Sequence, residues 1–436
     1  MSSEITIRGL SPLTESCPAD EAQLAELLTL AGAGGAACYI AGGLTKQDWG
    51  PAPARIDRLV STAGLSGCSD VDPDNLTLSA APGTTVAEAR ERAHAVDRIL
   101  PLDPGHPGRA TIGGVVATGD QGARAAGYGG LRDLVLGVRA TLADGSAVKF
   151  GGRTMKNVTG YDMTKLFVGS FGILGVITEA TFRLLPRFDS QAVAILPLPS
   201  LDEAKASVAR IIASYLQPLA LEVISADALP PDFASSTAKL PGGRAATGAP
   251  AAGGRPLLLA GFSGHRAAVD RSIKEVTEAH PGVAAQVLRD DAAETLYEHL
   301  AASGPEAGGD RLGLRASVPI SRALDMVAAA QTCAASNGLS VGFRAGAARG
   351  RVDLLLATRD GSGPNTDAWF ASVLSHMRAQ AVSMGGSLFV TGGAALLPGG
   401  YDAWGDVGPS LAIMKRIKER FDPTGILNPG RFVGGI

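Results

Sequence analysis

Residues 101–179 read PLDPGHPGRATIGGVVATGDQGARAAGYGGLRDLVLGVRATLADGSAVKFGGRTMKNVTGYDMTKLFVGSFGILGVITE, and this stretch decides the fold. Glycines stand in it, singly or in pairs, wherever an extended segment is expected to turn. Glycine tolerates positive φ and lets backbone lie against another group without a Cβ in the way. The pattern therefore predicts a cradle that holds a cofactor largely through its main chain.

The first part of this stretch is a conformationally restricted segment that precedes a glycine pair. Pro101-Leu102-Asp103-Pro104 restricts the backbone, and Thr111-Ile112-Gly113-Gly114 follows it. We expect the second segment to form a turn whose N–H groups hold phosphate or ring carbonyl oxygens.

The rest of the stretch predicts strands around a short helix. Segments 134–142 and 146–150 flank Asp144-Gly145, a strong hairpin signal. Asp162 is expected to N-cap a short helix through Leu166 and Phe167, and a strand is expected over residues 175–185.

A second glycine-rich loop lies near the N-terminus. A predicted strand over residues 37–40 runs into Ala41-Gly42-Gly43-Leu44-Thr45-Lys46. Open N–H groups, a hydroxyl and a cation suit a pyrophosphate, although an ordinary tight turn would have the same residues. The loop is neither a Walker A sequence nor a GxGxxG, so nucleoside triphosphate and Rossmann-type dinucleotide binding lose support.

Composition narrows the class of protein. The chain has 436 residues and a formal charge of −3, which argues against a nucleic-acid surface. Cys17, Cys38, Cys68 and Cys333 are too scattered to hold zinc or an iron–sulfur cluster. The sequence has no recognisable signal peptide and no apolar run of the length a membrane span needs, so it predicts a cytoplasmic protein without a transmembrane segment.

The second half predicts an α+β unit. Its last elements follow the order β-α-β-β-α-β, over residues 312–318, 321–336, 340–345, 351–358, 367–384 and 387–391. This order is typical of a ferredoxin-like unit, and two such units could be fused into one antiparallel sheet. We expect a mobile loop over about residues 238–256, which are rich in Gly, Ala and Pro.

Taken together, the motifs resemble a known family. AGGLTKQDWG, PLDP, TIGG, YGGLRDLVLGV, ADG, GGRTMKNVTGYD, LFVGSFGILGVITEATFRLLP and FDPTGILNPGR are similar to segments of FAD-binding proteins of the vanillyl-alcohol oxidase type, especially the FAD-binding subunits of bacterial glycolate oxidases. The resemblance implies an α+β fold: a PCMH-type FAD-binding domain of two subdomains (1–187), a ferredoxin-like cap domain (188–405) and a C-terminal segment (406–436) that packs back on the FAD domain.

The resemblance also implies a set of residues around a non-covalent FAD, since no His stands in the AGGLTK loop. They are Gly42, Gly43, Thr45, Lys46, Pro101, Asp103, Pro104, Thr111, Gly113, Gly114, Gly119, Tyr128, Arg132, Asp133, Asn157, Gly160, Asp162, Gly175, Val176, Ile177 and Asn428. No catalytic residue and no metal ligand is predicted.

The sequence differs from the family pattern at positions that matter for hydroxy-acid oxidation. Family members that oxidise hydroxy acids carry a GSEGTLG-like segment and a His-rich metal motif. In this chain Phe171 and Ile173 replace the acidic and hydroxyl residues of that segment, and the His-rich motif is absent from the sequence. We therefore expect an accessory subunit that passes electrons between a catalytic flavin subunit and an iron–sulfur subunit, with membrane association only through these partners.

Two alternatives remain open. The chain could be a self-sufficient dehydrogenase of glycolate or D-lactate, in which Arg344, Arg349 or Arg351 holds the substrate carboxylate, although these arginines are expected to be solvated. It could also be a structural subunit with a vestigial flavin site.

Overall fold

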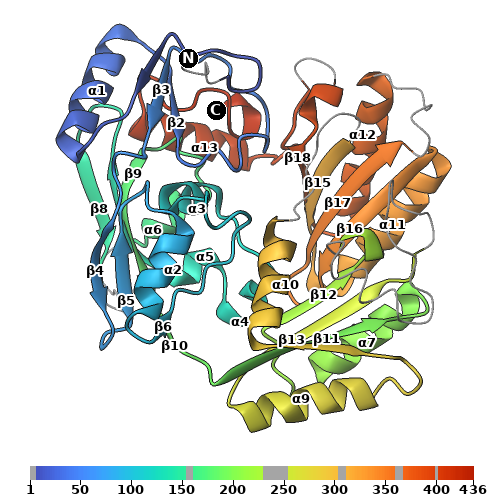
Figure 1. Cartoon of the computed structure of the whole chain (residues 1–436). Helices are drawn as coiled ribbons and strands as arrows, with labels where there is room; N and C mark the ends of the chain where they lie inside the picture. Colours follow the sequence, from blue (N-terminus) through green and yellow to red (C-terminus); the bar gives the residue numbers. More distant parts are fainter. Residues whose placement is uncertain (1–5, 154–160, 229–253, 303–310, 359–366, 398–400) are drawn as a thin grey trace, which may run out of the picture. The chain divides into compact units, whose positions relative to one another are not determined.

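The computed structural model describes residues 6–153, 161–228, 254–302, 311–358, 367–397 and 401–436. The chain forms two compact units (Figure 1). The first comprises Met1–Gln121, Gly129–Arg187 and Asp406–Ile436, and the second comprises Gly122–Tyr128 and Phe188–Gly405. Most of the predicted mobile loop, residues 238–253, lies outside the described residues.

A small parallel sheet opens the first unit. Its strands, in the order β1-β3-β2, are β1 (Thr14–Ser16), β3 (Arg58–Ser61) and β2 (Cys38–Ala41). Helix α1 (Glu21–Gly34) begins after Asp20, whose carboxylate accepts the N–H of Gln23 at 2.8 Å, and ends before Gly35 at φ +64°. Its buried Leu24 and Leu28 form a core with Cys38 and Val60.

A five-stranded antiparallel sheet forms the rest of this unit. In sheet order its strands are β4 (Cys68–Asp72), β5 (Thr77–Ala80), β9 (Val176–Arg183), β7 (Val135–Thr141) and β8 (Ala147–Gly151). The predicted hairpin at Asp144-Gly145 is confirmed, with Gly145 at φ +81°. Short strands β6 (Arg98–Ile99) and β10 (Leu185–Pro186) form a separate pair.

Helices share one hydrophobic core with this sheet. They are α2 (Val86–His94), α3 (Ile112–Thr118), α5 (Leu131–Leu134), α6 (Thr164–Phe167) and α13 (Ser410–Phe421). The predicted turn at residues 111–114 is wrong: Thr111 is the N-cap of α3, because its hydroxyl accepts the N–H of Gly114 at 3.4 Å. The predicted N-cap Asp162 is also wrong, since Met163 takes that position while Asp162 binds the Thr164 hydroxyl and Lys165.

The second unit is built on one eight-stranded antiparallel sheet, which confirms the prediction of fused α+β units. In sheet order the strands are β14 (Gln286–Arg289), β11 (Ser190–Pro197), β13 (Leu257–Gly264), β12 (Ala220–Ile224), β16 (Leu339–Gly346), β17 (Arg351–Thr358), β15 (Arg311–Ser317) and β18 (Ser387–Gly392). The sequence did not predict β11, because both of its faces are buried and its residues do not alternate between apolar and polar.

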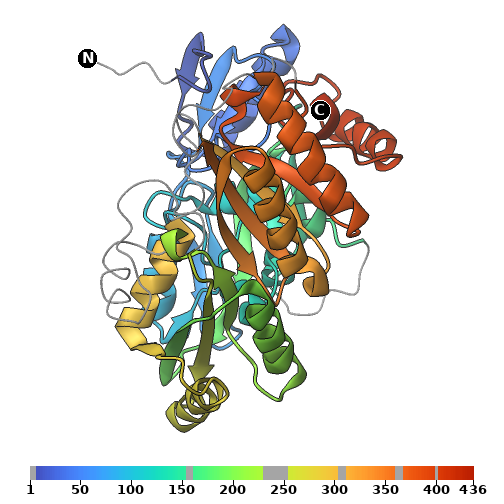
Figure 2. The same cartoon turned by 90° about the vertical axis from the view of Figure 1, so that its right-hand side faces the viewer.

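Helices cover both faces of this sheet. Alternate residues of β11 divide between two cores: Ala192 and Ala194 face one, and Val193 and Ile195 face the other. The first core is closed by α7 (Leu201–Ala213), α9 (Arg266–Glu278), α11 (Ala323–Ser336) and α12 (Asp367–Ser383), of which α7 (green) and α11 and α12 (orange) lie in front of the sheet in Figure 2. The second is closed by α10 (Asp290–Ala302), and α4 (Ala125–Tyr128) contacts β12. No described helix is long and apolar enough to cross a membrane.

Candidate functional site

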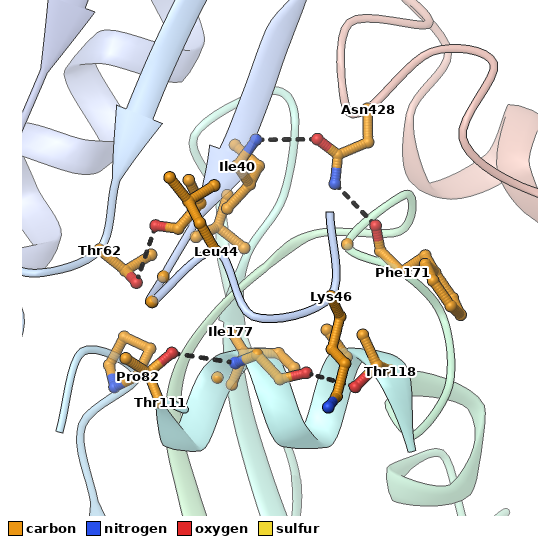
Figure 3. A pocket seen from close by; sticks show the side chains of 18 of the residues that line it. Ile40, Leu44, Lys46, Thr62, Pro82, Thr111, Thr118, Phe171, Ile177 and Asn428 are labelled. Carbon is orange, nitrogen blue, oxygen red and sulfur yellow. Dashed lines mark hydrogen bonds between the residues drawn. The ribbon is translucent and has the colours of Figure 1, made fainter. Parts of the chain in front are cut away.

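A cavity opens in the first unit. Segments distant in sequence line it: residues 39–47, Thr62, Pro82, residues 111–118 in part, Phe171, Gly172, residues 175–177, Asn428 and Arg431 (Figure 3).

Many of the predicted site residues meet at this cavity. Those that line it are Gly42, Gly43, Thr45, Lys46, Thr111, Gly113, Gly114, Gly175, Val176, Ile177 and Asn428. They come from β2 and the loop after it, α3, the start of β9 and the C-terminal segment. The fold thus joins the two glycine-rich segments that the sequence singled out separately.

Other predicted residues lie away from the cavity wall. Pro101, Asp103 and Pro104 are buried in the segment between β6 and α3, and Gly119 is the C-cap of α3 at φ +68°. These positions shape the backbone that leads into and out of α3, without lining the cavity themselves.

The remaining predicted residues that the structure describes do not line the cavity either. Arg132 donates to the Val168 carbonyl at 3.4 Å, and the Asp133 carboxylate accepts the N–H of Gly130 at 3.2 Å. Tyr128 belongs to the second unit, where its ring stacks on Phe188 with centroids 6.3 Å apart. Asp162 is exposed. Asn157 and Gly160 lie outside the described residues.

The loop after β2 can approach α3 only because it has no side chains at two positions. A Cβ on Gly43 would lie 1.7 Å from the Arg109 carbonyl oxygen, and one on Gly42 would lie 2.1 Å from the Thr111 hydroxyl. Leu44 has φ +54°. Among the described residues, none accepts a hydrogen bond from the N–H of Gly43, Leu44 or Thr45. These donors are available to an anion in the cavity.

Two cations stand in the cavity wall. The Lys46 Nζ lies 3.0 Å from the buried Asp120 carboxylate and 5.3 Å from the Trp49 ring centroid. Arg431 lies over the Tyr39 ring at 5.8 Å and donates to the Pro51 carbonyl, and burial lowers the pKa of its guanidinium. Open N–H groups and two cations fit the pyrophosphate of a dinucleotide such as FAD.

Asn428 lies on the side of the cavity opposite α3 (Figure 3). Its Oδ1 accepts the N–H of Ile40 at 2.8 Å, and its Nδ2 donates to the Phe171 carbonyl at 2.7 Å. Its own N–H donates to the Cys38 carbonyl at 2.9 Å. One side chain therefore ties the C-terminal segment both to β2 and to the loop before β9.

A buried ion pair anchors this C-terminal segment. The Lys418 ammonium lies 2.5 Å from the Asp422 carboxylate and donates to the carbonyls of Ile173 and Leu427, each at 2.9 Å. Burial lowers the pKa of Lys418, while Asp422 opposes that shift. Asp422 also accepts the N–H of Leu427 at 2.8 Å. FDPTG therefore positions Asn428 in addition to ending α13.

Sequence reasoning missed several residues of the cavity. Arg431 belongs to the segment NPGR, and its sequence context does not distinguish a cavity residue from a turn residue. Phe171 and Gly172 have φ of +54° and +69°, and a Cβ on Gly172 would lie 2.7 Å from the Asn428 Nδ2. Ile40, Thr62, Pro82 and Thr118 also line the cavity, and their residue types carry no chemical signal.

A cluster of charges occupies the sheet of the second unit. Asp353 accepts Arg315 Nε at 2.6 Å, Arg351 Nε at 2.9 Å and Arg344 Nη2 at 3.2 Å. Although burial disfavours its charge, these guanidinium groups hold the pKa of Asp353 well below its usual range. The expectation that these arginines are solvated is wrong, because Arg344 is buried and Arg349 and Arg351 are half-buried. Among the described residues, no group of His, Cys, Asp and Glu could hold a metal ion.

Two family descriptions match the chain. "FAD binding domain" matches residues 12–151, and "FAD linked oxidases, C-terminal domain" matches residues 188–432, which is more than half of the chain. The fold resembles that of alkyldihydroxyacetonephosphate synthase, with a TM-score of 0.69 at 15% identity over 96% of this chain and 77% of that one.

The relatives of the chain are named as different enzymes or enzyme subunits. A D-lactate dehydrogenase of Archaeoglobus fulgidus is 34% identical over 47% of this chain and 46% of that protein. The glycolate oxidase subunit GlcE of Escherichia coli is 40% identical over 35% of this chain and 43% of that protein. An uncharacterized FAD-linked oxidoreductase of Mycobacterium tuberculosis is 28% identical over 99% of this chain and 93% of that one. The chain thus matches less than half the length of the first two.

Proposed function

Because the chain belongs to the FAD-linked oxidases, we propose that this FAD-dependent oxidoreductase is the accessory subunit of a 2-hydroxy acid dehydrogenase complex of the glycolate oxidase kind. One observation carries the proposal. The cavity has cations and open N–H groups for FAD, but no described residue that lines it is His, Asp or Glu. Oxidation of a 2-hydroxy acid needs a base for the hydroxyl proton, and the His and carboxylate side chains that most often serve as that base are not among the described residues of this cavity wall.

The residues of the cavity would bind and orient the cofactor. The N–H groups of Gly43, Leu44 and Thr45, with Lys46 and Arg431, would hold the pyrophosphate. The carboxylate of Asp120 keeps the Lys46 ammonium beside the loop. Asn428 would fix the wall opposite α3. The bound flavin supplies the redox chemistry, which the protein tunes through its surroundings.

The proposed partners rest on the similarity to a glycolate oxidase subunit. Electrons would arrive from a catalytic flavin subunit and leave to an iron–sulfur subunit, each a separate polypeptide. We also propose a cytoplasmic location, with any membrane association made through these partners.

A second candidate is a self-sufficient dehydrogenase of glycolate or D-lactate. The arginines around Asp353 favour it, because buried guanidinium groups suit a substrate carboxylate. The relative named D-lactate dehydrogenase favours it also.

Anaerobic flavin reduction separates the two candidates. The purified chain is mixed with glycolate or D-lactate, first alone and then with a catalytic flavin subunit. We expect the flavin absorbance to bleach only when the partner is present. Bleaching by substrate alone would overturn the accessory role in favour of the second candidate. A complex that turns over normally when the flavin cavity is disabled would overturn both and indicate a structural subunit.

A further inference from the structure

We propose that FAD enters and leaves its cavity when residues 426–431, here called the strap, separate from β2 and from residues 51–54. Two strap residues, Asn428 and Arg431, line the cavity. The strap and both of the segments that hold it belong to the first unit. The inference rests on the assignment of FAD to this cavity, and it concerns access to the cofactor site, which the proposed function leaves open.

The strap pairs with β2 as a short extra strand. The N–H of Cys38 donates to the Ile426 carbonyl at 2.7 Å, and the N–H of Asn428 donates to the Cys38 carbonyl at 2.9 Å. These two bonds form a parallel bridge between Cys38 and Leu427. Because β2 is the last strand in its sheet, the strap can separate from it without breaking the pairs inside the sheet.

Residues 51–54 also hold the strap. The N–H of Ala54 donates to the Pro429 carbonyl at 2.8 Å, and the Arg431 guanidinium donates to the Pro51 carbonyl. A Cβ on Gly430 would lie 2.8 Å from the Ala54 nitrogen and 2.9 Å from the Ala54 Cβ. The strap therefore reaches this position only because residue 430 has no side chain.

The strap is held in place against backbone strain. Asn428 has φ +45°, and Phe171, whose carbonyl accepts the Asn428 amide at 2.7 Å, has φ +54° (Figure 3). A left-handed backbone is unfavourable for residues other than glycine, and for a bulky residue such as Phe more than for Asn. Separation of the strap frees both residues to leave this conformation. Strained positions of this kind are typical of ligand clamps and switch regions.

The other walls of the cavity lack this freedom. α3 and β9 contribute Ile112, Val115 and Ile177 to the main hydrophobic core of the first unit. Movement of α3 or β9 would open that core to water, whereas movement of the strap exposes two apolar side chains, Ile426 and Leu427. The strap is therefore the wall whose movement exposes the least apolar surface.

The buried Lys418–Asp422 pair marks where the moving segment begins. When the strap leaves, the two groups keep each other, and Lys418 keeps the Ile173 carbonyl at 2.9 Å. Gly425, at φ +65°, lies between this pair and the strap. A hinge needs a position that absorbs a large change in φ and ψ, and Gly425 supplies it.

Gly430→Ala tests the proposal, because the added methyl group collides with Ala54 and displaces the strap. We expect the folded variant both to release FAD and to take it up at least tenfold faster than the native chain, since an open strap lets the cofactor pass in both directions. Release is followed by the rise of flavin fluorescence after dilution. Uptake is followed by the loss of fluorescence when FAD is added to chain that has been stripped of flavin.

Gly435→Ala is the matched control. Gly435 has a similar backbone, with φ +75° against +81° for Gly430, but its Cβ would meet nothing within 4 Å. The control variant carries the same kind of backbone strain without displacing the strap, so we expect both of its rates to lie within twofold of the native rates.

A reversible tether tests the same movement from the opposite direction. Leu427→Cys places a second thiol beside Cys38, its bridge partner in the same core. The variant is oxidised with diamide, and disulfide formation is verified by thiol titration. FAD release from the oxidised chain should be at least tenfold slower than from the reduced chain, and a reductant should restore the faster rate.

Equal release from the oxidised and reduced forms of the tethered chain would overturn the proposal. Faster release with unchanged uptake in Gly430→Ala would overturn it also, because the strap would then only contact FAD. Each experiment decides the question if the other variant fails to fold or to form its disulfide. A native chain that binds no flavin even after addition of FAD contradicts the assignment of the cavity, and this inference falls with it. Bound FAD with unaltered exchange contradicts this inference alone.

Discussion

The side-chain amide of Asn428 accepts the N–H of Ile40 at 2.8 Å, although 388 residues separate the two. Asn428 has φ +45°, a left-handed conformation that Asn tolerates better than most residues. The same amide donates to the Phe171 carbonyl at 2.7 Å. Asn428 therefore links β2, the loop before β9 and the C-terminal segment in the cavity wall.

Replacement of Asn428 should destabilise the first unit. Asn428→Gly keeps the left-handed backbone but leaves the N–H of Ile40 and the carbonyl of Phe171 without this partner, at a cost of about 1–3 kcal/mol. Asn428→Ala loses the same bonds and adds backbone strain of roughly 1–2 kcal/mol. Denaturant unfolding should therefore rank the native chain above the Gly variant and the Gly variant above the Ala variant. Equal stability of all three would contradict the bridging role.

Asp353 should be essential for the stability of the second unit. Asp353→Asn removes the carboxylate that three arginines contact and leaves buried charges uncompensated, which costs about 3–5 kcal/mol. Asp325 is the matched control, since it pairs with Lys205 at 2.9 Å in a more exposed position, and Asp325→Asn should cost at most about 1 kcal/mol. Similar losses in both variants, measured by denaturant unfolding, would show that the Asp353 cluster is unimportant for stability.

Glu222 should make stability depend on pH. Because its pKa is above the ordinary value of 4.5 in the folded chain, the folded state holds this proton more tightly than the unfolded state does. Its contribution to the free energy of unfolding is complete below about pH 4.5 and is lost as pH rises through the folded-state pKa. The native chain should therefore lose stability relative to Glu222→Gln as pH rises from 4.5 towards neutrality. A constant difference between the two curves would rule out a raised pKa.

Local chemistry explains which elements could be predicted from sequence. The hairpin at Asp144-Gly145 depends on neighbouring residues, and it is present. Thr111-Ile112-Gly113-Gly114 was expected to turn because of its glycines, but packing of Ile112 and Val115 in the core makes it helical. Tertiary burial outweighed local propensity at this point.

Long-range contacts explain what sequence reasoning missed in the sites. The positive φ of Phe171 and the place of Arg431 in the cavity depend on the returning C-terminal segment. The burial of Arg344 depends on its cross-strand pairing with Asp353. None of these relationships is encoded within a window of neighbouring residues, so composition and periodicity could not reveal them.

The measurement that tests the account most directly is the FAD content of the purified chain, read from its visible spectrum, in the native form and in Gly43→Ala. The added Cβ would lie 1.7 Å from the Arg109 carbonyl oxygen, so the loop after β2 must move. Gly108→Ala is the control from the facing segment, because its Cβ would meet nothing within 4 Å. We expect a flavin spectrum in the native chain and in Gly108→Ala, and its loss from a folded Gly43→Ala chain. Full FAD content in Gly43→Ala, or no flavin in the native chain, would contradict the assignment of this cavity to FAD.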